Sequence, residues 1–415
     1  MNRGFYTIMA AQFFSSLADN ALLFVAIDLL ITMKSPAWIT PLLKFLFVLF
    51  YVLLAAFVGA FADALPKGRV MFYANLVKIF GCAMLFYDVH PLAAYAIVGI
   101  GAAIYSPAKY GILTELLPPE KLVAANGWIE GLTISSIILG TVMGGALVSD
   151  RAEAIMTNWD IGMNNPAYGA LMIVGVLYIA AAAFNLRIPL TGCVYPHQER
   201  NPVRLIEDFA NCCMILWRDK LGQISLAVTT LFWGTGATLQ FIVLEWAKQS
   251  MGMSYEKATT MVGLVGLGVT VGAVMSARMI TLRNSLSVIP LGIAMGFIVM
   301  TMAFIHTPWL AYPLLILVGA LAGFFVVPMN ALLQHRGHVL MSAGHSIAVQ
   351  NFNENLSILT MLAMYSLMLR MDLALNTIIV LFGLFLSGSM LAIKRLHMIN
   401  QREHDTLALI GEHKH

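Results

Sequence analysis

Residues 59–69 read Gly-Ala-Phe-Ala-Asp-Ala-Leu-Pro-Lys-Gly-Arg, a short charged loop between two long apolar stretches. Gly59 has no Cβ, so it permits close approach of another helix. Asp63 suits the N-terminus of a neighbouring helix, where free backbone N–H groups favour a carboxylate. We expect Lys67 and Arg69 to hold the turn in the cytosol. The loop therefore predicts the end of one helix, a turn, and a contact with the N-terminus of a neighbouring helix.

The apolar stretches beside this loop are typical of the whole chain. Of 415 residues, 60% are apolar and only 11% are charged, and the mean hydropathy is +0.82. Soluble chains carry about 25% charged residues, so this composition excludes a soluble or a disordered protein. Residues 171–183 do not alternate between polar and apolar, which argues against a transmembrane barrel and favours helices. The net charge of +3 gives no sign of a nucleic-acid partner.

Apolar segment lengths predict an all-α polytopic membrane protein with twelve transmembrane helices. The expected spans are 5–33, 41–63, 69–88, 91–113, 125–149, 168–188, 221–248, 256–280, 285–306, 309–333, 342–370 and 373–396. The longest polar interruption, residues 189–220, is expected to be a cytosolic linker with an amphipathic surface helix at 202–217. It separates an N-terminal six-helix half, 1–188, from a C-terminal six-helix half, 221–397, which a cytosolic tail follows at 398–415.

The distribution of basic residues predicts the orientation. Apart from Lys78 and Lys109, which sit within helices, 16 Lys and Arg residues fall on the side of the N-terminus and 6 on the other side. Because basic residues accumulate on the cytosolic side, we expect both termini to be cytosolic.

The two halves carry faint traces of a repeat. Pro107 and Pro328 are 221 residues apart, and Glu130 and Glu354 are 224 residues apart. A repeat of this kind indicates a transporter with its site between the halves, near the bilayer midplane, although coincidence is an open alternative. Three pairs of glycines four residues apart predict close helix packing: Gly140 and Gly144, Gly268 and Gly272, and Gly319 and Gly323.

Polar side chains inside the spans mark the candidate site. A charge at a helix centre costs about 2.5–3.5 kcal/mol on insertion scales, so it usually faces a cavity or a partner. The candidates are Asp19, Asn20, Lys78, Tyr105, Lys109, Tyr110, Gln350, Asn351 and Glu354. Glu130, near the cytosolic end of its helix, is a candidate gate residue. An equally weighted interpretation makes Lys78 and Lys109 structural ion-pair partners of Asp19 or Glu130.

Enzymatic and metal chemistry find little support in the residue pattern. The four cysteines show no metal-ligand spacing, so we expect no metal and no cofactor. No His is followed five positions later by Asp, as in the usual glycerolipid acyltransferases, and no Gly-Lys dipeptide marks a P-loop. We therefore expect a protein that is not an enzyme.

The loop at residues 59–69 resembles the signature of the major facilitator superfamily, in which it stabilises one end state of the transport cycle. That resemblance implies the major facilitator fold and gating roles for Gly59, Asp63, Lys67 and Arg69. Further stretches resemble the bacterial lysophospholipid transporter family within it. They are residues 19–24, 67–69, 105–113, 125–127, 324–328, 330–334 and 348–351 with Glu354.

The resemblance also implies a function. Members of this family move lysophosphatidylethanolamine and lysophosphatidylglycerol inward across the bacterial inner membrane, where an acyltransferase–acyl carrier protein synthetase reacylates them. By this resemblance Asp19 would meet the ethanolamine ammonium, and Lys78 or Lys109 the phosphate. The family can present a basic residue where this chain has Gln240, which puts the charge balance of the site in question. We expect a monomer whose partners are the lysophospholipid and membrane lipids.

A proton-coupled exporter of drugs or other amphiphiles is the alternative on the same fold. Asp19 and Glu354 would then carry protons.

Overall fold

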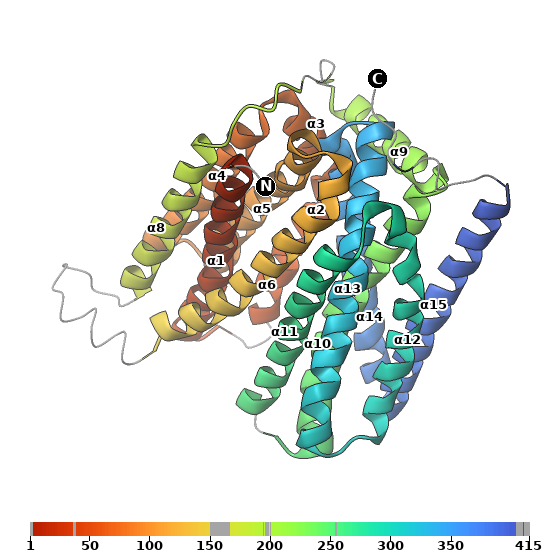
Figure 1. The fold of residues 1–415 in the computed structure, drawn as a ribbon. Helices are drawn as coiled ribbons and strands as arrows, with labels where there is room; N and C mark the ends of the chain where they lie inside the picture. The colour runs from red at the N-terminus through yellow and green to blue at the C-terminus, as the bar shows by residue number, and fades with distance from the viewer. Residues whose placement is uncertain are drawn as a thin grey trace. The chain divides into compact units, whose positions relative to one another are not determined.

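The computed structural model describes residues 3–35, 39–149, 167–193, 201–253 and 255–403, together with Tyr195, Glu199 and Ile410. Most of the expected tail therefore lies outside the described residues. The regular elements of the described part are helices (Figure 1). They are α1 (Arg3–Thr32), α2 (Thr40–Leu53), α3 (Ala55–Ala64), α4 (Lys67–Phe86), α5 (Pro91–Leu116), η2 (Pro119–Lys121), α6 (Leu122–Leu147), α8 (Ala167–Leu186), α9 (Pro202–Arg218), α10 (Gly222–Met251), α11 (Tyr255–Met279), η3 (Leu282–Val288), α12 (Ile289–Met300), η4 (Thr301–Phe304), α13 (Pro308–Leu340), α14 (Ala343–Arg370) and α15 (Leu375–Glu403).

Length and hydropathy make this a multi-pass membrane protein. Within the described residues, ten helical segments are long and apolar enough to cross a membrane, and α2 with α3 gives an eleventh. The expected single span at 41–63 is bent by 66°, because Leu54 leaves the helical conformation with ψ near 0°. The expected span at 342–370 is helical as α14, but its run of amides makes it too polar to count among these segments, so it stays an expected span.

The internal contacts of the chain define two compact units, which we describe separately. Unit 1 comprises Met1–Leu116, Ser135–Ala210 and Ala343–Ala348. Unit 2 comprises Leu117–Ile134, Asn211–Ser342 and Val349–His415. The first half of α6 thus belongs to unit 2, and the first six residues of α14 belong to unit 1. The domain limits expected from the sequence stay a prediction.

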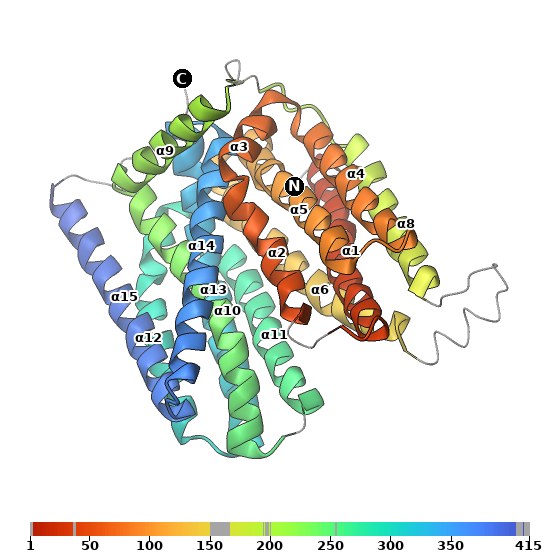
Figure 2. The ribbon, with the colours of Figure 1, turned by 180° about the vertical axis from the view of Figure 1, so that it is seen from behind.

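Unit 1 is built around α1, α4, α5 and α8. In it α1 packs on α8, and α4 packs on both α5 and α8 (Figures 1 and 2). Its core contains Leu22, Val25, Val98 and Tyr178, all fully buried. The second half of α6 approaches α1 so closely that a Cβ at Gly140 would lie 2.7 Å from the carbonyl oxygen of Leu17. The predicted close packing at this glycine is therefore confirmed.

Unit 2 contains two closely packed helix pairs, α11 with α13 and α12 with α15 (Figures 1 and 2). A Cβ at Gly272 of α11 would lie 1.9 Å from the carbonyl oxygen of Ala320 on α13. In the opposite direction, a Cβ at Gly323 of α13 would lie 2.1 Å from the carbonyl oxygen of Val269. Hydrogen at these positions lets the two backbones touch, so the predicted glycine faces are confirmed here too.

The amphipathic helix expected in the linker is confirmed as α9. Leu205, Phe209 and Leu216 lie along one side and face the protein, with Phe209 and Leu216 buried. A neighbouring stripe of apolar side chains is exposed, and it includes Val203 and Trp217. The side-chain oxygen of Asn201 accepts the backbone N–H of Val203 at 3.0 Å and so caps the start of the helix.

The substitution Gly272→Ala should destabilise the protein by about 1–3 kcal/mol, the usual range for overpacking. The matched control is Gly263→Ala on the same helix, where a Cβ meets nothing within 4 Å. That variant should be neutral or slightly stabilised, by up to about 1 kcal/mol, because alanine is the better helix former. Thermal unfolding of the purified protein in detergent measures both, and equal melting temperatures would contradict the packing assignment.

Candidate functional site

Asp19 of α1 is the centre of a buried polar cluster in unit 1. Its Oδ2 lies 2.7 Å from Lys78 Nζ of α4, and its Oδ1 accepts the hydroxyl of Tyr178 of α8 at 2.8 Å. The Tyr95 hydroxyl donates to the Asp19 backbone carbonyl at 3.3 Å. The structure therefore brings Asp19 and Lys78 together as an ion pair, the arrangement that the sequence allowed for either lysine.

The Lys78 ammonium is enclosed on several sides. It donates to Ser15 Oγ at 3.0 Å, and Ser15 donates in turn to Asn75 Oδ1 at 2.8 Å. Its Nζ also lies 5.0 Å from the ring centre of Tyr105, within the range of a cation–π interaction. The Tyr105 side chain is buried, and its hydroxyl has no hydrogen-bond partner among the described residues.

The exposure of the two charges differs. The Lys78 side chain is 2% exposed, whereas the Asp19 side chain is 15% exposed. The carboxylate is therefore the more accessible of the two charges. The side-chain amide of the adjacent Asn20 donates to the Ser16 carbonyl of its own helix at 2.8 Å.

Lys109 and Tyr110 of α5 form a cation–π contact. The Lys109 Nζ lies 4.0 Å from the ring centre of Tyr110. Both side chains are partly buried. Lys109 belongs to unit 1, like the pair of Asp19 and Lys78.

Unit 2 holds a buried network of amides and carboxylates. The Asn330 side-chain amide donates to Glu130 Oε1 at 3.2 Å, and Gln350 Nε2 donates to Asn330 Oδ1 at 3.0 Å. The same Gln350 nitrogen donates to Glu354 Oε1 at 2.7 Å. Asn330 of α13 therefore joins Glu130 to Gln350, and Gln350 joins this pair to Glu354. Asn351 is buried beside them on α14, whereas Gln240 is exposed on α10.

Asp63 occupies the kind of position that its loop predicts. Its carboxylate accepts the backbone N–H groups of Gly344 at 2.9 Å and His345 at 3.1 Å, at the N-terminus of α14. The Nδ1 atom of His345 lies 2.8 Å from the same carboxylate. Gly59 permits this approach, since a Cβ there would lie 3.0 Å from Ala348 Cβ.

Lys67 corrects one expectation. Expected in the solvated turn, it is buried, and its Nζ lies 2.5 Å from Asp63 Oδ1 and 3.4 Å from Glu115 Oε1. The carboxylates of Asp63 and Glu115 are themselves buried, and their negative charge compensates the Lys67 ammonium for its lost hydration. Arg69 is exposed, as the loop predicts.

An ion pair that sequence reasoning missed lies at the start of α10. Arg336 of α13 donates to Asp219 through Nε at 3.2 Å and through Nη2 at 2.7 Å. The Asp219 Oδ1 also accepts the N–H of Gly222, the first residue of α10, at 2.7 Å. One signal for it exists in the sequence: Arg336 follows Pro328 by eight positions, as Glu115 follows Pro107.

The reciprocal amide pair in unit 2 was also missed. Asn126 donates to Gln334 Oε1 at 2.8 Å, and Gln334 donates to Asn126 Oδ1 at 2.9 Å. Both side chains are buried. Their positions match stretches that resemble the lysophospholipid transporter family, and that resemblance was the available signal.

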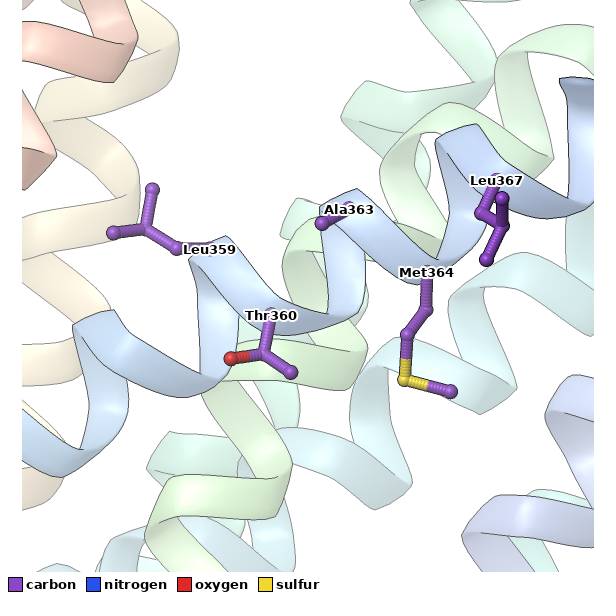
Figure 3. Close-up of a pocket in the computed structure, with 5 residues that line it drawn as sticks. All are labelled: Leu359, Thr360, Ala363, Met364 and Leu367. Carbon is purple, nitrogen blue, oxygen red and sulfur yellow. The ribbon is translucent and has the colours of Figure 1, made fainter.

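An open apolar hollow lies on one face of α14. Its volume is about 470 Å³. Figure 3 shows the five side chains along the helix, with Thr360 as the one polar member. They are Leu359, Thr360, Ala363, Met364 and Leu367.

Comparison with solved structures supports the fold. The chain superposes with a TM-score of 0.73 on a structure described as a bacterial homologue of the iron transporter ferroportin, covering 97% of this chain and 100% of that one at 14% identity. The TM-score is 0.70 for the transporter FucP, covering 95% of this chain and 98% of that one at 12% identity. The family model described as Major Facilitator Superfamily matches residues 6–362. Fold and sequence together define a membrane transporter of that superfamily.

Curated relatives narrow the assignment. The Pectobacterium carotovorum protein named Lysophospholipid transporter LplT is 40% identical, over 90% of this chain and 88% of its own length. The protein of the same name from Enterobacter sp. strain 638 is 42% identical, over 92% of this chain and 93% of its own length. This chain belongs to the LplT family of the major facilitator superfamily.

The substitution Lys78→Met should destabilise the protein by about 3 kcal/mol, because it leaves a largely buried carboxylate without its cation. Adding Asp19→Asn to it should recover part of the loss. The exposed Lys121 on η2 provides the matched control, Lys121→Met. Thermal unfolding measures five proteins: the wild type, Lys78→Met, Asp19→Asn, the double variant and the Lys121→Met control. Strictly additive losses for the two site substitutions would contradict the ion pair.

Proposed function

We propose that this protein transports lysophospholipids, with the head group bound at Asp19 and Lys78. The observation that carries the proposal is the ion pair itself, which lies within apolar spans and leaves Asp19 partly exposed. A phosphoethanolamine head group carries one cation and one anion. It can exchange partners with the pair, its ammonium going to Asp19 and its phosphate to Lys78, without leaving a net buried charge.

Lysophosphatidylglycerol is the second proposed substrate. Its head group offers a phosphate and hydroxyl groups but no ammonium. Within unit 1, Lys78 and Lys109 would bind the phosphate, and the Asn20 amide would meet a hydroxyl. Gln240, in unit 2, is a separate proposed contact of the hydroxyls. In unit 2, Gln350, Asn351 and Glu354 are further proposed contacts of the polar head. Tyr105 and Tyr110 would position the two lysines through their rings.

The acyl chain needs an apolar surface. The hollow on α14 is lined by aliphatic side chains, apart from Thr360, and it is open. Burying methylene groups there would contribute about 0.8 kcal/mol for each. We propose it as a surface along which part of the acyl chain lies.

Transport would run by alternating access, inward across the bacterial inner membrane, with both termini in the cytosol. Gly59, Asp63, Lys67, Arg69 and Glu130 are the proposed gate residues. The bonds from Asp63 to the start of α14 hold one end state, and breaking them permits the other. A cytosolic-side acyltransferase–acyl carrier protein synthetase would then reacylate the product. The protein would act as a monomer, without catalysis of its own.

Proton-coupled export is the second candidate. The observation in its favour is the buried pair of carboxylates, Glu130 and Glu354, joined through Asn330 and Gln350. A proton relay in a transporter uses acidic groups buried in this way.

The deciding measurement is the flipping of labelled lysophosphatidylethanolamine in proteoliposomes, with and without a protonophore. We expect flipping to be insensitive to the protonophore and to fall at least about tenfold in Asp19→Asn, since the ammonium loses its counter-charge (about 1.4 kcal/mol is tenfold in rate). The matched control is Asp88→Asn, because Asp88 is an exposed carboxylate at the end of α4. Asparagine also tolerates the positive φ of 55° at that position.

A protonophore that abolishes uptake would move the assignment to an ion-coupled carrier. Normal flipping in Asp19→Asn would remove the head-group contact from the proposal.

A further inference from the structure

Two linker residues bind the carboxylate of Glu115. The Thr191 hydroxyl donates to Glu115 Oε2 at 2.7 Å, and the Tyr195 hydroxyl donates to Glu115 Oε1 at 2.9 Å. Glu115 lies in the last turn of α5, and its side chain is 2% exposed. Its two oxygens are thus held by residues 76 and 80 positions away, which ties the first part of the linker to unit 1.

Tyr195 also reaches the beginning of α14. Its hydroxyl oxygen accepts the backbone N–H of Ala343, the first residue of that helix. The next two N–H groups, of Gly344 and His345, go to Asp63. The first backbone N–H groups of a helix have no partner within the helix. Here Tyr195 and Asp63 satisfy three of them in sequence.

The tyrosine can do this only as a neutral phenol. Burial, followed by the Glu115 carboxylate, raises the pKa of Tyr195 well above its usual value. The hydroxyl therefore keeps its proton and donates it to Glu115, while its oxygen stays free to accept from Ala343. The Lys67 ammonium lies 4.9 Å from the centre of the Tyr195 ring and 3.4 Å from Glu115. The Tyr195 side chain therefore connects the charges of Lys67 and Glu115 with the start of α14.

We propose that Thr191 and Tyr195 form a strap, in which the linker holds the N-terminus of α14 in the state described here and sets how readily it is released. Asp63 and Lys67 belong to the superfamily signature, whereas these two residues lie outside every stretch that carries the family resemblance. They are positioning residues and contact no substrate. The role of the strap in transport rests on the proposed function, whereas its hydrogen bonds do not depend on that function.

The strap gives the linker a defined role in the cycle. The bonds from Tyr195 and Asp63 to the first turn of α14 exist together in this state, so leaving it requires that both sets break. Removing the Tyr195 hydroxyl eliminates two hydrogen bonds at once and leaves the ring beside Lys67. The equilibrium between end states should then shift away from this state by about tenfold, as expected for two bonds of modest net strength.

Hydrogen–deuterium exchange of the full-length protein in lipid nanodiscs tests the strap without any substrate. In Tyr195→Phe, exchange in a peptide covering residues 341–350 should be about tenfold faster than in the wild type. Thr191→Val should change it in the same direction by less, because Tyr195 still holds Ala343. Tyr312→Phe, an exposed tyrosine of α13, is the matched control and should leave exchange unchanged.

Flipping of labelled lysophosphatidylethanolamine by the same variants tests the role in transport. We expect Tyr195→Phe to change the maximal rate at least about twofold while the half-saturating lipid concentration stays constant. Unchanged exchange at the start of α14 overturns the strap, as does exchange that is faster throughout α11 and α13. Faster local exchange with an unchanged maximal rate overturns its part in transport. If the wild type flips no lysolipid but the exchange pattern is as expected, the strap stands and the lipid function fails.

Discussion

A carboxylate inside an apolar helical bundle must face a cation or N–H groups, and this constraint arranges the polar interior of the chain. Leaving one unpaired costs several kcal/mol in a medium that excludes water. Three aspartates meet the requirement, each with a basic side chain. The pairs are Asp19 with Lys78, Asp63 with Lys67, and Asp219 with Arg336. Two of the three also accept the first N–H groups of a helix, so the same interaction that neutralises a charge fixes where a helix begins.

In each unit, a charged residue eight positions after a proline inside a helix belongs to one of these buried ion-pair clusters, and its charge is negative in unit 1 and positive in unit 2. Glu115 and Arg336 both stand eight residues after a proline inside a helix, at Pro107 and Pro328. Glu115 joins the network of Lys67, whereas Arg336 binds Asp219, whose carboxylate accepts the first N–H group of α10. The correspondence adds one more pair of equally spaced positions to the predicted repeat, and at this pair the sign of the charge is reversed.

The helices, the amphipathic α9 and the place of Asp63 follow from local features of the sequence, namely apolar length, a period of 3.6 residues, and a carboxylate at the end of a helix. The burial of Lys67 and the contact from Tyr178 to Asp19 do not. Spans such as α1 are apolar over most of their surface, so the pattern of residues does not say which helices pack against the side that carries Asp19. The partners of Asp19 come from α4 and α8, and they become visible only when those helices are packed. The bend at Leu54 could not be predicted either, because no proline or glycine lies beside it in the sequence.

The ion pair also limits what can bind beside it. Lys78 and Asp19 have given up most of their hydration, so a ligand has to replace each contact that it breaks. A zwitterion can do so group for group. An anion that took Lys78 alone would leave Asp19 with the Tyr178 hydroxyl but without a cation, and binding would weaken accordingly. Lys109, on the helix that also carries Tyr105, can offset this if it supplies the charge for the phosphate. At the proposed site, the order of head groups would then be set by how much of the pair a ligand disrupts, and only secondarily by its size.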